Sequence, residues 1–370
     1  MRICITVNAA WNVWNFRRPL VRALIDAGHS VHVLAPYDET VEDLLAMGCA
    51  FTHLPMSRKG LNPLLEMALL VRFCRTFQRL RPDAVLSFTV KNNIFGSLAS
   101  ALFSIPFVPN VTGLGTAFLS EGVLQRVSIM LQRLAFRRCP VVFFQNEDDR
   151  DLFVESRIVT VHQARVLPGS GIDLEAFMPV AAAGRPEPLF LFVGRLLRDK
   201  GVIELAEAAR IVRTARPDVT VQILGAFDHA NRSAISRAEV DEWVRQGSIV
   251  YLGQADDVRP HVAKADCVVL PSYREGAPRT LIEAAAMARP AIATDVPGCR
   301  AVVENELTGL LCAVRDANSL AKAMLRFCDF DSEERAAMGD AARRKMEQEF
   351  SADLITEEYM NSLSKLVSKR

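Results

Sequence analysis

Short apolar runs alternate with longer amphipathic segments along most of the chain. Apolar runs bounded by glycine, proline or polar residues are typical of buried parallel strands, and apolar residues spaced three and four apart indicate helices. In the first half this alternation predicts a parallel sheet with helices on both faces. The predicted strands are Ile3–Val7, Ser30–Ala35, Phe51–Leu54, Ala84–Phe88, Phe107–Val111 and Val141–Gln145; the predicted helices are Phe16–Ala27, Val41–Met47, Pro63–Leu80, Asn93–Phe103 and Leu124–Arg138, with Asn8–Asn15 as the first loop.

The second half repeats the pattern after a short strand at Arg165–Pro168 and an exposed connection, rich in Ala and Pro, at Val180–Pro188. We therefore expect two Rossmann-like domains, residues 1–170 and residues 171–351. The predicted strands of the second domain are Leu189–Val193, Thr220–Leu224, Ile249–Leu252, Val268–Leu270 and Ala291–Thr294; its predicted helices are Val202–Arg213, Glu239–Gln246, Val258–Lys264 and one that begins at Pro278 and ends before Pro290.

The composition agrees with a two-domain protein of the cytoplasm. A chain of 370 residues, half of them apolar, has room for about two domains with separate cores. The formal net charge of +1 gives no sign of a nucleic-acid partner. The eight cysteines are scattered without a C-x-x-C pair, so we expect buried thiols in a reducing compartment. No signal peptide and no membrane-spanning run is evident, so any membrane contact is expected at the surface.

The most informative stretch runs from Val268 to Arg300 and predicts strand, loop, helix and strand in succession. Glu275 lies in the loop and Glu283 inside the helix. A helix N-terminus favours a phosphate, and the small residues after Glu275 allow a ligand to approach the backbone. The two carboxylates then lie where they can bind hydroxyls at opposite ends of a nucleotide-sugar. The alternative is a pair of solvated glutamates, but a charged Glu283 in an apolar helix is expected to be paired or functional.

Glu275-Gly276-Ala277-Pro278-Arg279-Thr280-Leu281-Ile282-Glu283 resembles the E-x7-E element of the retaining glycosyltransferases of family 4, and most of all the subgroup that builds bacterial O-antigen, capsule and exopolysaccharide on lipid carriers. The resemblance implies that Glu275 contacts the donor sugar and Glu283 the ribose. It also implies the GT-B fold: an α/β architecture of two Rossmann-like domains facing a cleft. In that fold a C-terminal helix, roughly Asp353–Val367 within residues 352–370, crosses back onto the first domain.

A second group of candidate residues follows the predicted strand Leu189–Val193. Gly194-Arg195 and Lys200 precede a helix, where two cations can neutralise a diphosphate. Taken alone they favour a solvated turn, because charged loops after strands are common, but the family places its diphosphate-binding Arg and Lys at this spacing. The predicted catalytic residues are Glu275, Arg195 and Lys200. The predicted donor contacts are Gly194, Arg195, Lys200, Gly225, Leu252, Gly276, Ala277, Pro278, Thr280 and Glu283, although Gly225 and Gly253 serve equally well as turn glycines.

Candidate acceptor contacts lie in the first domain. Lys91 and Asn93 belong to a segment that resembles the subgroup's K-x-N-x-x-G element, and Gly113 and Gly115 to one that resembles its T-G-L-G element; Arg17 is a further candidate. Asn146–Asp149 resembles the subgroup's Q-N-x-D-D motif. It is not the D-x-D pattern that holds a metal in the other major transferase fold, so we predict metal independence and no cofactor. Many members of the family have a histidine after the strand that reads VPNVTG here, but this chain has none. The absence of that histidine fits a mechanism in which the leaving phosphate takes the acceptor proton.

Two predicted helices carry arginines among apolar residues: Leu124–Arg138 has four of them, and Pro63–Leu80 has three. A basic amphipathic helix binds anionic headgroups, although ordinary surface helices also carry arginine. Together with these helices, the resemblance to the lipid-carrier subgroup implies a hexosyltransferase that is peripheral on the inner face of the bacterial cytoplasmic membrane. It is expected to move a sugar, most readily from a UDP-sugar, to an undecaprenyl-diphosphate-linked saccharide.

Three other functions are compatible with parts of the pattern. A UDP-sugar 2-epimerase shares the GT-B shape but would need a histidine in the cleft and no acceptor. A nicotinamide-dependent oxidoreductase is opposed by the first loop, NAAWNVWNF, which lacks the G-x-G-x-x-G fingerprint, and by Phe118 in the third glycine position after Gly113 and Gly115. A nucleotide-binding module without catalysis is opposed by the presence of both cations and both glutamates.

Overall fold

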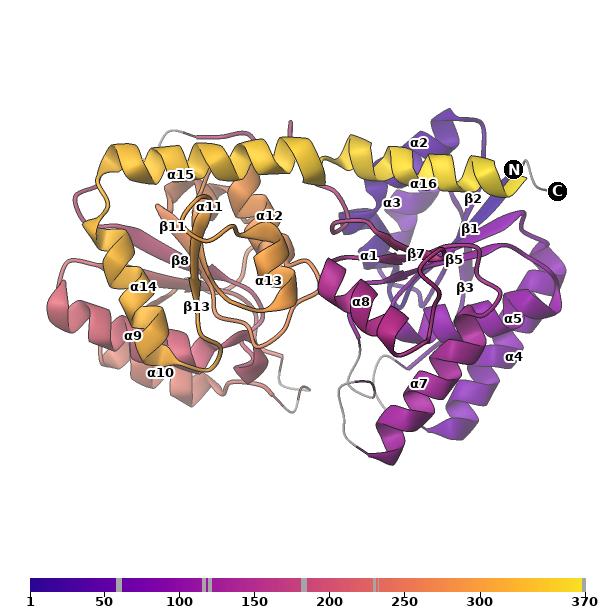
Figure 1. The fold of residues 1–370 in the computed structure, drawn as a ribbon, viewed down its shortest axis with the longest axis horizontal. Helices are drawn as coiled ribbons and strands as arrows, with labels where there is room; N and C mark the ends of the chain where they lie inside the picture. The colour runs from indigo at the N-terminus through magenta and orange to yellow at the C-terminus, as the bar shows by residue number, and fades with distance from the viewer. Residues whose placement is uncertain are drawn as a thin grey trace. The chain divides into compact units, whose positions relative to one another are not determined.

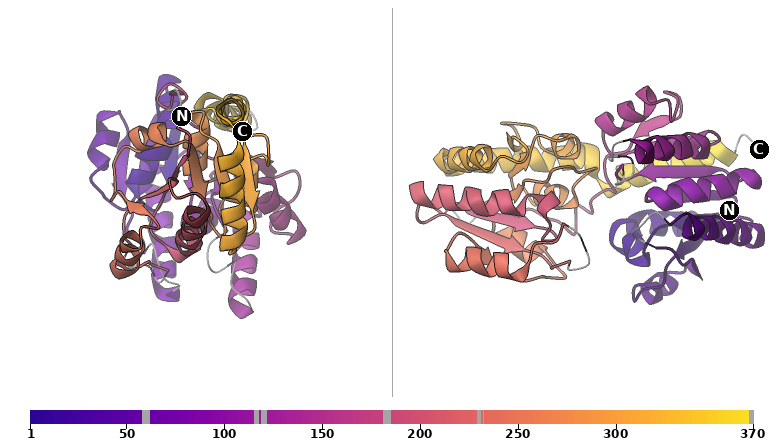
Figure 2. Two further views of the ribbon diagram at one scale, coloured as in Figure 1. Left: turned by 90° about the vertical axis from the view of Figure 1, so that its left-hand side faces the viewer. Right: turned by 90° about the horizontal axis from the view of Figure 1, so that it is seen from below.

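The computed structural model describes residues 1–57, 62–114, 118, 122–180, 185–228, 231 and 233–367. The chain divides into two compact units, of which unit 1 comprises Met1–Gly171 with Ala352–Arg370 and unit 2 comprises Ile172–Ser351. Each unit is a parallel sheet with helices on both faces (Figures 1 and 2). Within the described ranges, no helix combines the length and the apolarity that a bilayer span requires.

The sheet of unit 1 has seven parallel strands in the order β3-β2-β1-β4-β5-β6-β7. β4 and β5 are buried along their whole length, as expected for inner strands covered on both faces. The strands are β1 (Arg2–Thr6), β2 (Ser30–Ala35), β3 (Ala50–His53), β4 (Ala84–Phe88), β5 (Phe107–Val111), β6 (Val142–Phe144) and β7 (Ala164–Val166).

The helices of unit 1 depart from the prediction near the N-terminus. The Asn- and Trp-rich segment Asn8–Asn15, predicted as a loop, forms most of a first helix, and the predicted helix Phe16–Ala27 begins two residues late. The break falls at Arg17 because Pro19 lacks a backbone N–H and begins a new helix instead of continuing the old one. The helices are α1 (Ala10–Phe16), α2 (Arg18–Asp26), α3 (Val41–Ala46), α4 (Pro63–Leu80), the π-helix η1 (Asn92–Gly96), α5 (Ser97–Leu102), α7 (Val123–Phe136) and α8 (Glu147–Glu155).

The C-terminal helix α16 (Ala352–Val367) belongs to unit 1 and lies beside α2 (Figure 1). Ile355, Tyr359 and Leu363 are four residues apart and fully buried in the core of this unit. The Tyr359 ring packs against Phe143 at 5.1 Å between centroids, and its hydroxyl accepts a 2.5 Å hydrogen bond from Asn110 Nδ2. The expectation that the C-terminal helix packs on the first domain is confirmed.

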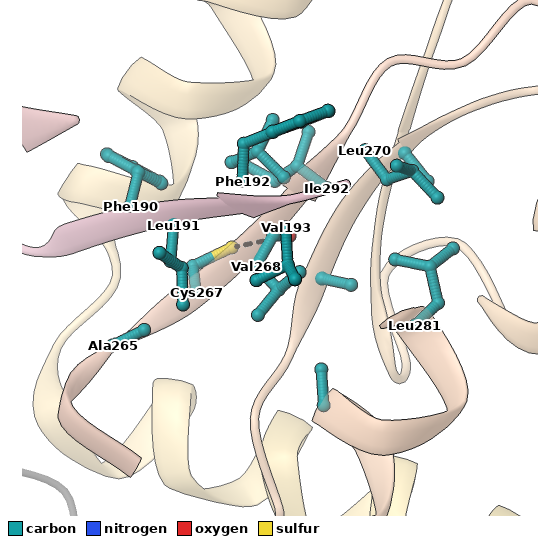
Figure 3. Packing of buried hydrophobic residues seen from close by; sticks show 14 of the residues in the cluster. Phe190, Leu191, Phe192, Val193, Ala265, Cys267, Val268, Leu270, Leu281 and Ile292 are labelled. Carbon is teal, nitrogen blue, oxygen red and sulfur yellow. Dashed lines mark hydrogen bonds between the residues drawn. The ribbon is translucent and has the colours of Figure 1, made fainter. Parts of the chain in front are cut away.

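Unit 2 has a six-stranded parallel sheet in the order β10-β9-β8-β11-β12-β13. The central strands β8 (Leu189–Val193) and β11 (Cys267–Leu270) are completely buried, and Leu281 of α12 (Arg279–Ala286) points toward them (Figure 3). The other strands are β9 (Thr220–Leu224), β10 (Val250–Tyr251), β12 (Ala291–Thr294) and β13 (Gly309–Cys312). The other helices are the short 3-10 helix η2 (Arg198–Lys200), α9 (Val202–Ala215), α10 (Arg237–Arg245), α11 (Arg259–Lys264), α13 (Pro297–Val302), α14 (Ala317–Asp329), α15 (Ser332–Lys345) and the π-helix η3 (Met346–Phe350).

Both sheets reverse their strand order once, and open parallel sheets commonly bind ligands at such a reversal. In unit 1 the chain runs outward from β1 to β3 and then returns to place β4 on the other side of β1. In unit 2 the same reversal places β11 beside β8. The loops that leave two such neighbouring strands turn to opposite faces of the sheet, so a crevice forms at their carboxyl ends. Of the predicted site residues, Lys200 follows β8, Glu275 follows β11 and Lys91 follows β4, so these three lie at the two reversals.

Candidate active site

The reversal point of unit 2 brings together the two loops that carry the predicted catalytic residues. Lys200 ends η2 after β8, and Glu275 lies in the loop after β11, 75 residues further on. Lys200 Nζ donates to Glu275 Oε1 in a partly buried ion pair. The side chains are 26% and 12% exposed, so one edge of the pair stays open to a ligand. A cation and a carboxylate in contact at the carboxyl ends of neighbouring strands fit a site for an anionic, hydroxylated ligand.

Backbone contacts hold these two loops against each other. Tyr273 N donates to Asp199 O at 2.9 Å, which links the β11 loop to η2. Gly201 has φ +69°, and a Cβ there would collide with the carbonyl oxygen of Pro271. Gly298 of α13 lies directly against the backbone of Glu275. Our prediction assigned no role to Gly201 or Gly298. The sequence did contain a signal for both, because Gly201 directly precedes a predicted helix and Gly298 follows Pro297, and both patterns are typical of turns and helix starts.

The position of Arg195 is more open than that of Lys200. Its guanidinium pairs with Asp228 at 2.9 Å, and its side chain is 60% exposed. Within the described residues no contact joins it to Lys200 or Glu275. Arg195 therefore lies at the same strand end as Lys200 but on the solvent side, where its long side chain can reorient toward a ligand at little cost.

Glu283 is held by a residue that the sequence prediction passed over. Arg279 Nε donates to Glu283 Oε1 at 2.8 Å across one turn of α12, and the Glu283 side chain is 15% exposed. Burial raises the pKa of Glu283 above its ordinary value, and the neighbouring Arg279 charge opposes this rise. The expectation that a charged residue in this apolar helix would be paired is confirmed. The i,i+4 spacing of Arg279 and Glu283 was the sequence signal for the pair.

The start of α12 lies against the end of β8. Pro278 is the N-cap residue and supplies no side-chain hydrogen bond to the first turn, so the first amides of the helix are not capped by it. Thr280 Oγ1 donates to Val193 O at 3.1 Å and fixes this end of the helix beside Gly194. Gly276 and Ala277 lead into the helix and are partly exposed. The turn that was predicted to bind a phosphate follows Glu275 directly in the sequence, and its contact with a phosphate remains a prediction.

Gly194, Gly225 and Leu252 follow three neighbouring strands of unit 2 and are joined through the backbone. Gly194 N donates to Leu224 O at 3.0 Å, Gly225 N to Gly253 O at 2.7 Å, and Leu252 N to Ile223 O at 2.9 Å. A Cβ at Gly225 would collide with the carbonyl oxygen of Gly194. Close packing of the strand ends is thus sufficient reason for glycine at position 225, and its predicted ligand contact remains a prediction.

We expect Gly225→Ala to destabilise the protein by about 2–3 kcal/mol, because the added methyl group overlaps backbone that cannot move without breaking the strand ends apart. Gly113→Ala is the matched control, since nothing lies within 4 Å of a Cβ built there, and it should change the stability by less than about 0.5 kcal/mol. Urea unfolding monitored by circular dichroism measures both. Equal midpoints for the two variants would contradict the packing argument.

The predicted acceptor residues of unit 1 are only partly brought together. Lys91 follows β4 and donates to Glu66 in the first turn of α4, with side chains 20% and 14% exposed. Thr89, two residues earlier, has a positive φ of 76° and donates to Asn92 Oδ1 at 2.9 Å, which shapes this turn. Gly113 is partly exposed with open space around it. Gly115 lies outside the described residues.

Asn93 and Arg17 are buried and take part in packing. Asn93 is 2% exposed and donates from Nδ2 to Asn110 O at 2.7 Å. Arg17 is 6% exposed, with its guanidinium 4.2 Å from the centre of the Phe88 ring. Sequence spacing alone does not separate a buried asparagine at a strand end from one that faces a ligand. Their acceptor roles remain predictions, and among the members of the predicted set that the structure describes, Lys91 and Gly113 have the accessible positions.

Two family models match the chain, one in each unit. The model described as glycosyl transferase 4-like domain matches residues 13–170, and the model described as glycosyl transferases group 1 matches residues 187–329. The chain belongs to this glycosyltransferase family. Lys200, Glu275 and Glu283 all fall inside the matched part of unit 2.

Two curated relatives match most of the length of this glycosyltransferase. It is 28% identical over 339 residues to the N,N′-diacetylbacillosaminyl-diphospho-undecaprenol α-1,3-N-acetylgalactosaminyltransferase of Campylobacter jejuni, covering 87% of this chain and 88% of that protein. It is 26% identical over 289 residues to the UDP-Gal:α-D-GlcNAc-diphosphoundecaprenol α-1,3-galactosyltransferase of Escherichia coli, covering 74% of each. The family and transferase class predicted from the E-x7-E element are confirmed.

Solved structures confirm the fold. Sucrose-phosphate synthase of Thermosynechococcus elongatus superposes with a TM-score of 0.80 at 20% identity, covering 100% of both chains. HepE of Anabaena in complex with UDP superposes with a TM-score of 0.78 at 18% identity, covering 99% of this chain and 100% of that one. The glycosyltransferase thus has the predicted GT-B architecture of two Rossmann-like parallel-sheet domains.

Proposed function

We propose that this glycosyltransferase moves a sugar from a UDP-sugar to an undecaprenyl-diphosphate-linked saccharide, with retention at the anomeric carbon, in bacterial surface polysaccharide synthesis. The observation that carries the proposal is the partly buried Lys200–Glu275 pair beside the start of α12. A cation beside a helix N-terminus suits a diphosphate, and a carboxylate next to the cation suits a sugar, so this pair supports the proposal.

The proposed chemistry is a single exchange of bonds at the anomeric carbon. The bond from this carbon to the diphosphate oxygen breaks, and a bond to the acceptor hydroxyl oxygen forms on the same face. The acceptor proton passes to the departing phosphate oxygen. Lys200, Arg195 and the start of α12 stabilise the negative charge that grows on the leaving group, and Glu275 orients the donor sugar. Because these cations already provide positive charge, we propose that the reaction uses no metal ion and no cofactor.

Two observations support a UDP-sugar donor and a lipid-linked acceptor. The Campylobacter jejuni and Escherichia coli relatives are named for diphospho-undecaprenol acceptors and α linkages, and the Escherichia coli enzyme is also named for UDP-Gal as its donor. In unit 1, Lys91 lies at the strand reversal with its ammonium group against the first turn of α4, and this partly exposed cation supports the proposed contact with an acceptor phosphate. A lipid-linked acceptor also implies that the enzyme works at the cytoplasmic face of the membrane, as a peripheral protein.

The first test is a thermal-shift panel with UDP, GDP, ADP and NAD. We expect UDP, at a concentration about a hundredfold above its Kd, to raise the Tm by about 5–10 °C, because a ligand that binds only the folded state stabilises it. The other three nucleotides should shift the Tm less. Transfer from UDP-sugars to a synthetic undecaprenyl-diphosphate saccharide, with and without EDTA, then tests the reaction and its metal independence.

The remaining alternatives give distinct results in these assays. A UDP-sugar 2-epimerase would form a new UDP-sugar in the absence of any acceptor. A binding module without catalysis would show the UDP shift but no product with any donor. Stabilisation by NAD alone would refute the donor site and favour an oxidoreductase.

A further inference from the structure

Two exposed aromatic side chains of unit 1 lie beyond the carboxyl ends of neighbouring strands. In the part of the chain that the structure describes, the most exposed aromatic side chains are those of Tyr37, Trp11 and Phe103, at 57%, 48% and 39%. Trp11 follows β1, and Tyr37 follows β2, the strand paired with β1. The two loops are in direct contact, because Trp11 N donates to Asp38 Oδ2 at 3.0 Å. A single exposed ring is ordinary, but two rings at one edge of a sheet indicate a binding surface.

Both rings are held in place although they are exposed. The Trp11 ring packs edge-on against Phe16, with 5.1 Å between the ring centroids. The Tyr37 ring packs edge-on against Phe51 at 6.2 Å, and its hydroxyl donates to Glu42 Oε1 at 3.2 Å. Side chains that are fixed before a ligand arrives lose little conformational freedom when it binds. The two rings are therefore suited to bind a ligand with a flat apolar face.

Polar groups lie beside the Trp11 ring on the same two loops. The exposed Asn15 lies one turn further along α1 and donates from Nδ2 to Trp11 O at 3.0 Å. The partly exposed Asp38 accepts from Thr40 N and Thr40 Oγ1 as well as from Trp11 N. An amide donates and accepts, and a carboxylate has about four acceptor positions, so both groups can bind hydroxyls next to the ring. A sugar fits this combination, since its C–H bonds form an apolar face and its hydroxyls lie around the edge.

The turn that carries Lys91 follows the strand on the other side of β1. Asn92 Nδ2 donates to Thr6 Oγ1 at 2.6 Å, which ties this turn to the end of β1. Tyr37, Trp11 and Lys91 therefore follow three adjacent strands, β2, β1 and β4. Neighbouring strands are about 4.8 Å apart, a spacing comparable to the width of a sugar ring. A ligand with a phosphate at Lys91 can thus have a sugar ring at Trp11.

We propose that Trp11 and Tyr37 form a subsite for the saccharide of the lipid-linked acceptor. The sugar next to the diphosphate stacks on the Trp11 ring, with Asn15 and Asp38 beside it for its hydroxyls, and the following sugar lies on Tyr37. The inference rests on the proposed function, because it takes Lys91 as the contact of the acceptor phosphate. It adds a recognition element of a different kind, since the acceptor residues predicted from the sequence include no aromatic side chain.

The experiment is calorimetric titration of the full chain with two short-chain carriers, farnesyl diphosphate and farnesyl-diphospho-N-acetylglucosamine. Their comparison isolates the contribution of the sugar, and N-acetylglucosamine presents C–H bonds on both faces of its ring. We expect the native chain to bind the sugar-bearing carrier about tenfold more tightly. Trp11→Ala should abolish this gain and leave the affinity for farnesyl diphosphate within about twofold of the native value. The contact with Asp38 persists in this variant, because it uses the backbone N–H.

Three further variants control for this result. Trp11→Phe keeps an aromatic face and should retain most of the gain. A farnesyl-diphospho-linked disaccharide of N-acetylglucosamine should bind about threefold more tightly than the monosaccharide carrier, and Tyr37→Ala should remove this second gain alone. Phe103 ends α5 and precedes β5, so it lies toward the amino ends of the strands, at the opposite edge of the sheet. Phe103→Ala, the matched control, should keep both gains.

The outcomes separate this subsite from the proposed function. A sugar-dependent gain that survives Trp11→Ala overturns the subsite, and so does the absence of any such gain in the native chain. Equal weakening of both carriers by Trp11→Ala would show that the ring contacts the lipid or the phosphates, and this also overturns it. The UDP thermal shift should be the same in Trp11→Ala and the native chain. A Trp11-dependent gain without transfer from any UDP-sugar would support the subsite and refute the proposed transfer reaction.

Discussion

Lys200→Ala is expected to reduce sugar transfer by about two to three orders of magnitude, as removal of one charge-stabilising group commonly does at an active site. The ammonium group lies in contact with Glu275 at the reversal point of the unit 2 sheet. A leaving nucleoside diphosphate gains negative charge as the glycosidic bond breaks, so the fixed cation stabilises the transition state more than the bound donor. The loss should therefore fall mainly on kcat. It is measured by steady-state transfer assays over a range of donor concentrations.

Arg198→Ala is the matched control for this prediction. Arg198 belongs to the same short helix as Lys200, but it pairs with Glu239 at 2.7 Å, away from Glu275. Its loss should change transfer by no more than a few fold. Lys200→Ala also leaves Glu275, only 12% exposed, without its cation, and this alone can disturb the loop. The double variant Lys200→Ala with Glu275→Gln removes that unpaired charge. If it recovers full transfer, neither residue has the role proposed here.

Glu283→Gln is expected to weaken UDP binding about 10- to 100-fold without lowering the Tm of the ligand-free protein. Burial raises the pKa of Glu283, so its contribution to stability is fully present below the unfolded pKa and is lost as pH rises through the folded value. At neutral pH the folded state therefore carries the cost of a buried carboxylate, partly offset by Arg279 at 2.8 Å. Gln removes that cost while keeping the shape. It cannot bind ribose hydroxyls with the strength of a carboxylate.

The pH dependence gives this prediction a second readout. The Tm difference between Glu283→Gln and the native chain should increase, in favour of the variant, from about pH 4 to pH 7. Glu207→Gln, at an exposed glutamate of α9, should show neither this trend nor a change in UDP affinity. Calorimetric titration with UDP measures the affinity. An affinity equal to that of the native chain would exclude Glu283 from the nucleotide site.

The sequence predicted the sheets better than the details of the site. Buried strands such as β8 and β11 are apolar along their whole length. Such a run can be recognised in the sequence without knowing which elements pack against it. The break between α1 and α2 at Arg17 was missed because Asn and Trp suggested a loop, whereas Ala10 and Val13 are buried three residues apart. Arg279 was visible as the i,i+4 partner of Glu283, but its importance depends on how deeply that turn is buried.

The acceptor side shows the limit of motif-based prediction. Lys91 and Asn93 lie two residues apart in one motif, yet Lys91 reaches α4 at the surface and Asn93 is buried against Asn110. The π-helix η1 begins between them, at Asn92, and sets their directions. Two residues are too few to show whether the helix between them is an α-helix or a π-helix. The motif therefore predicts a turn at this place, but it does not predict which of its side chains faces a ligand.

The position of α16 affects the order in which the two units can fold during synthesis. Tyr359 and Leu363 complete the core of unit 1, but the ribosome adds them after all of Ile172–Ser351. Unit 2 is continuous in sequence and can close as soon as it has emerged. Until α16 follows, the nascent unit 1 exposes Phe143 and the apolar side of α2, a surface on which chaperones would act. Unit 1, although synthesis begins with it, therefore cannot complete its core until unit 2 has been synthesised.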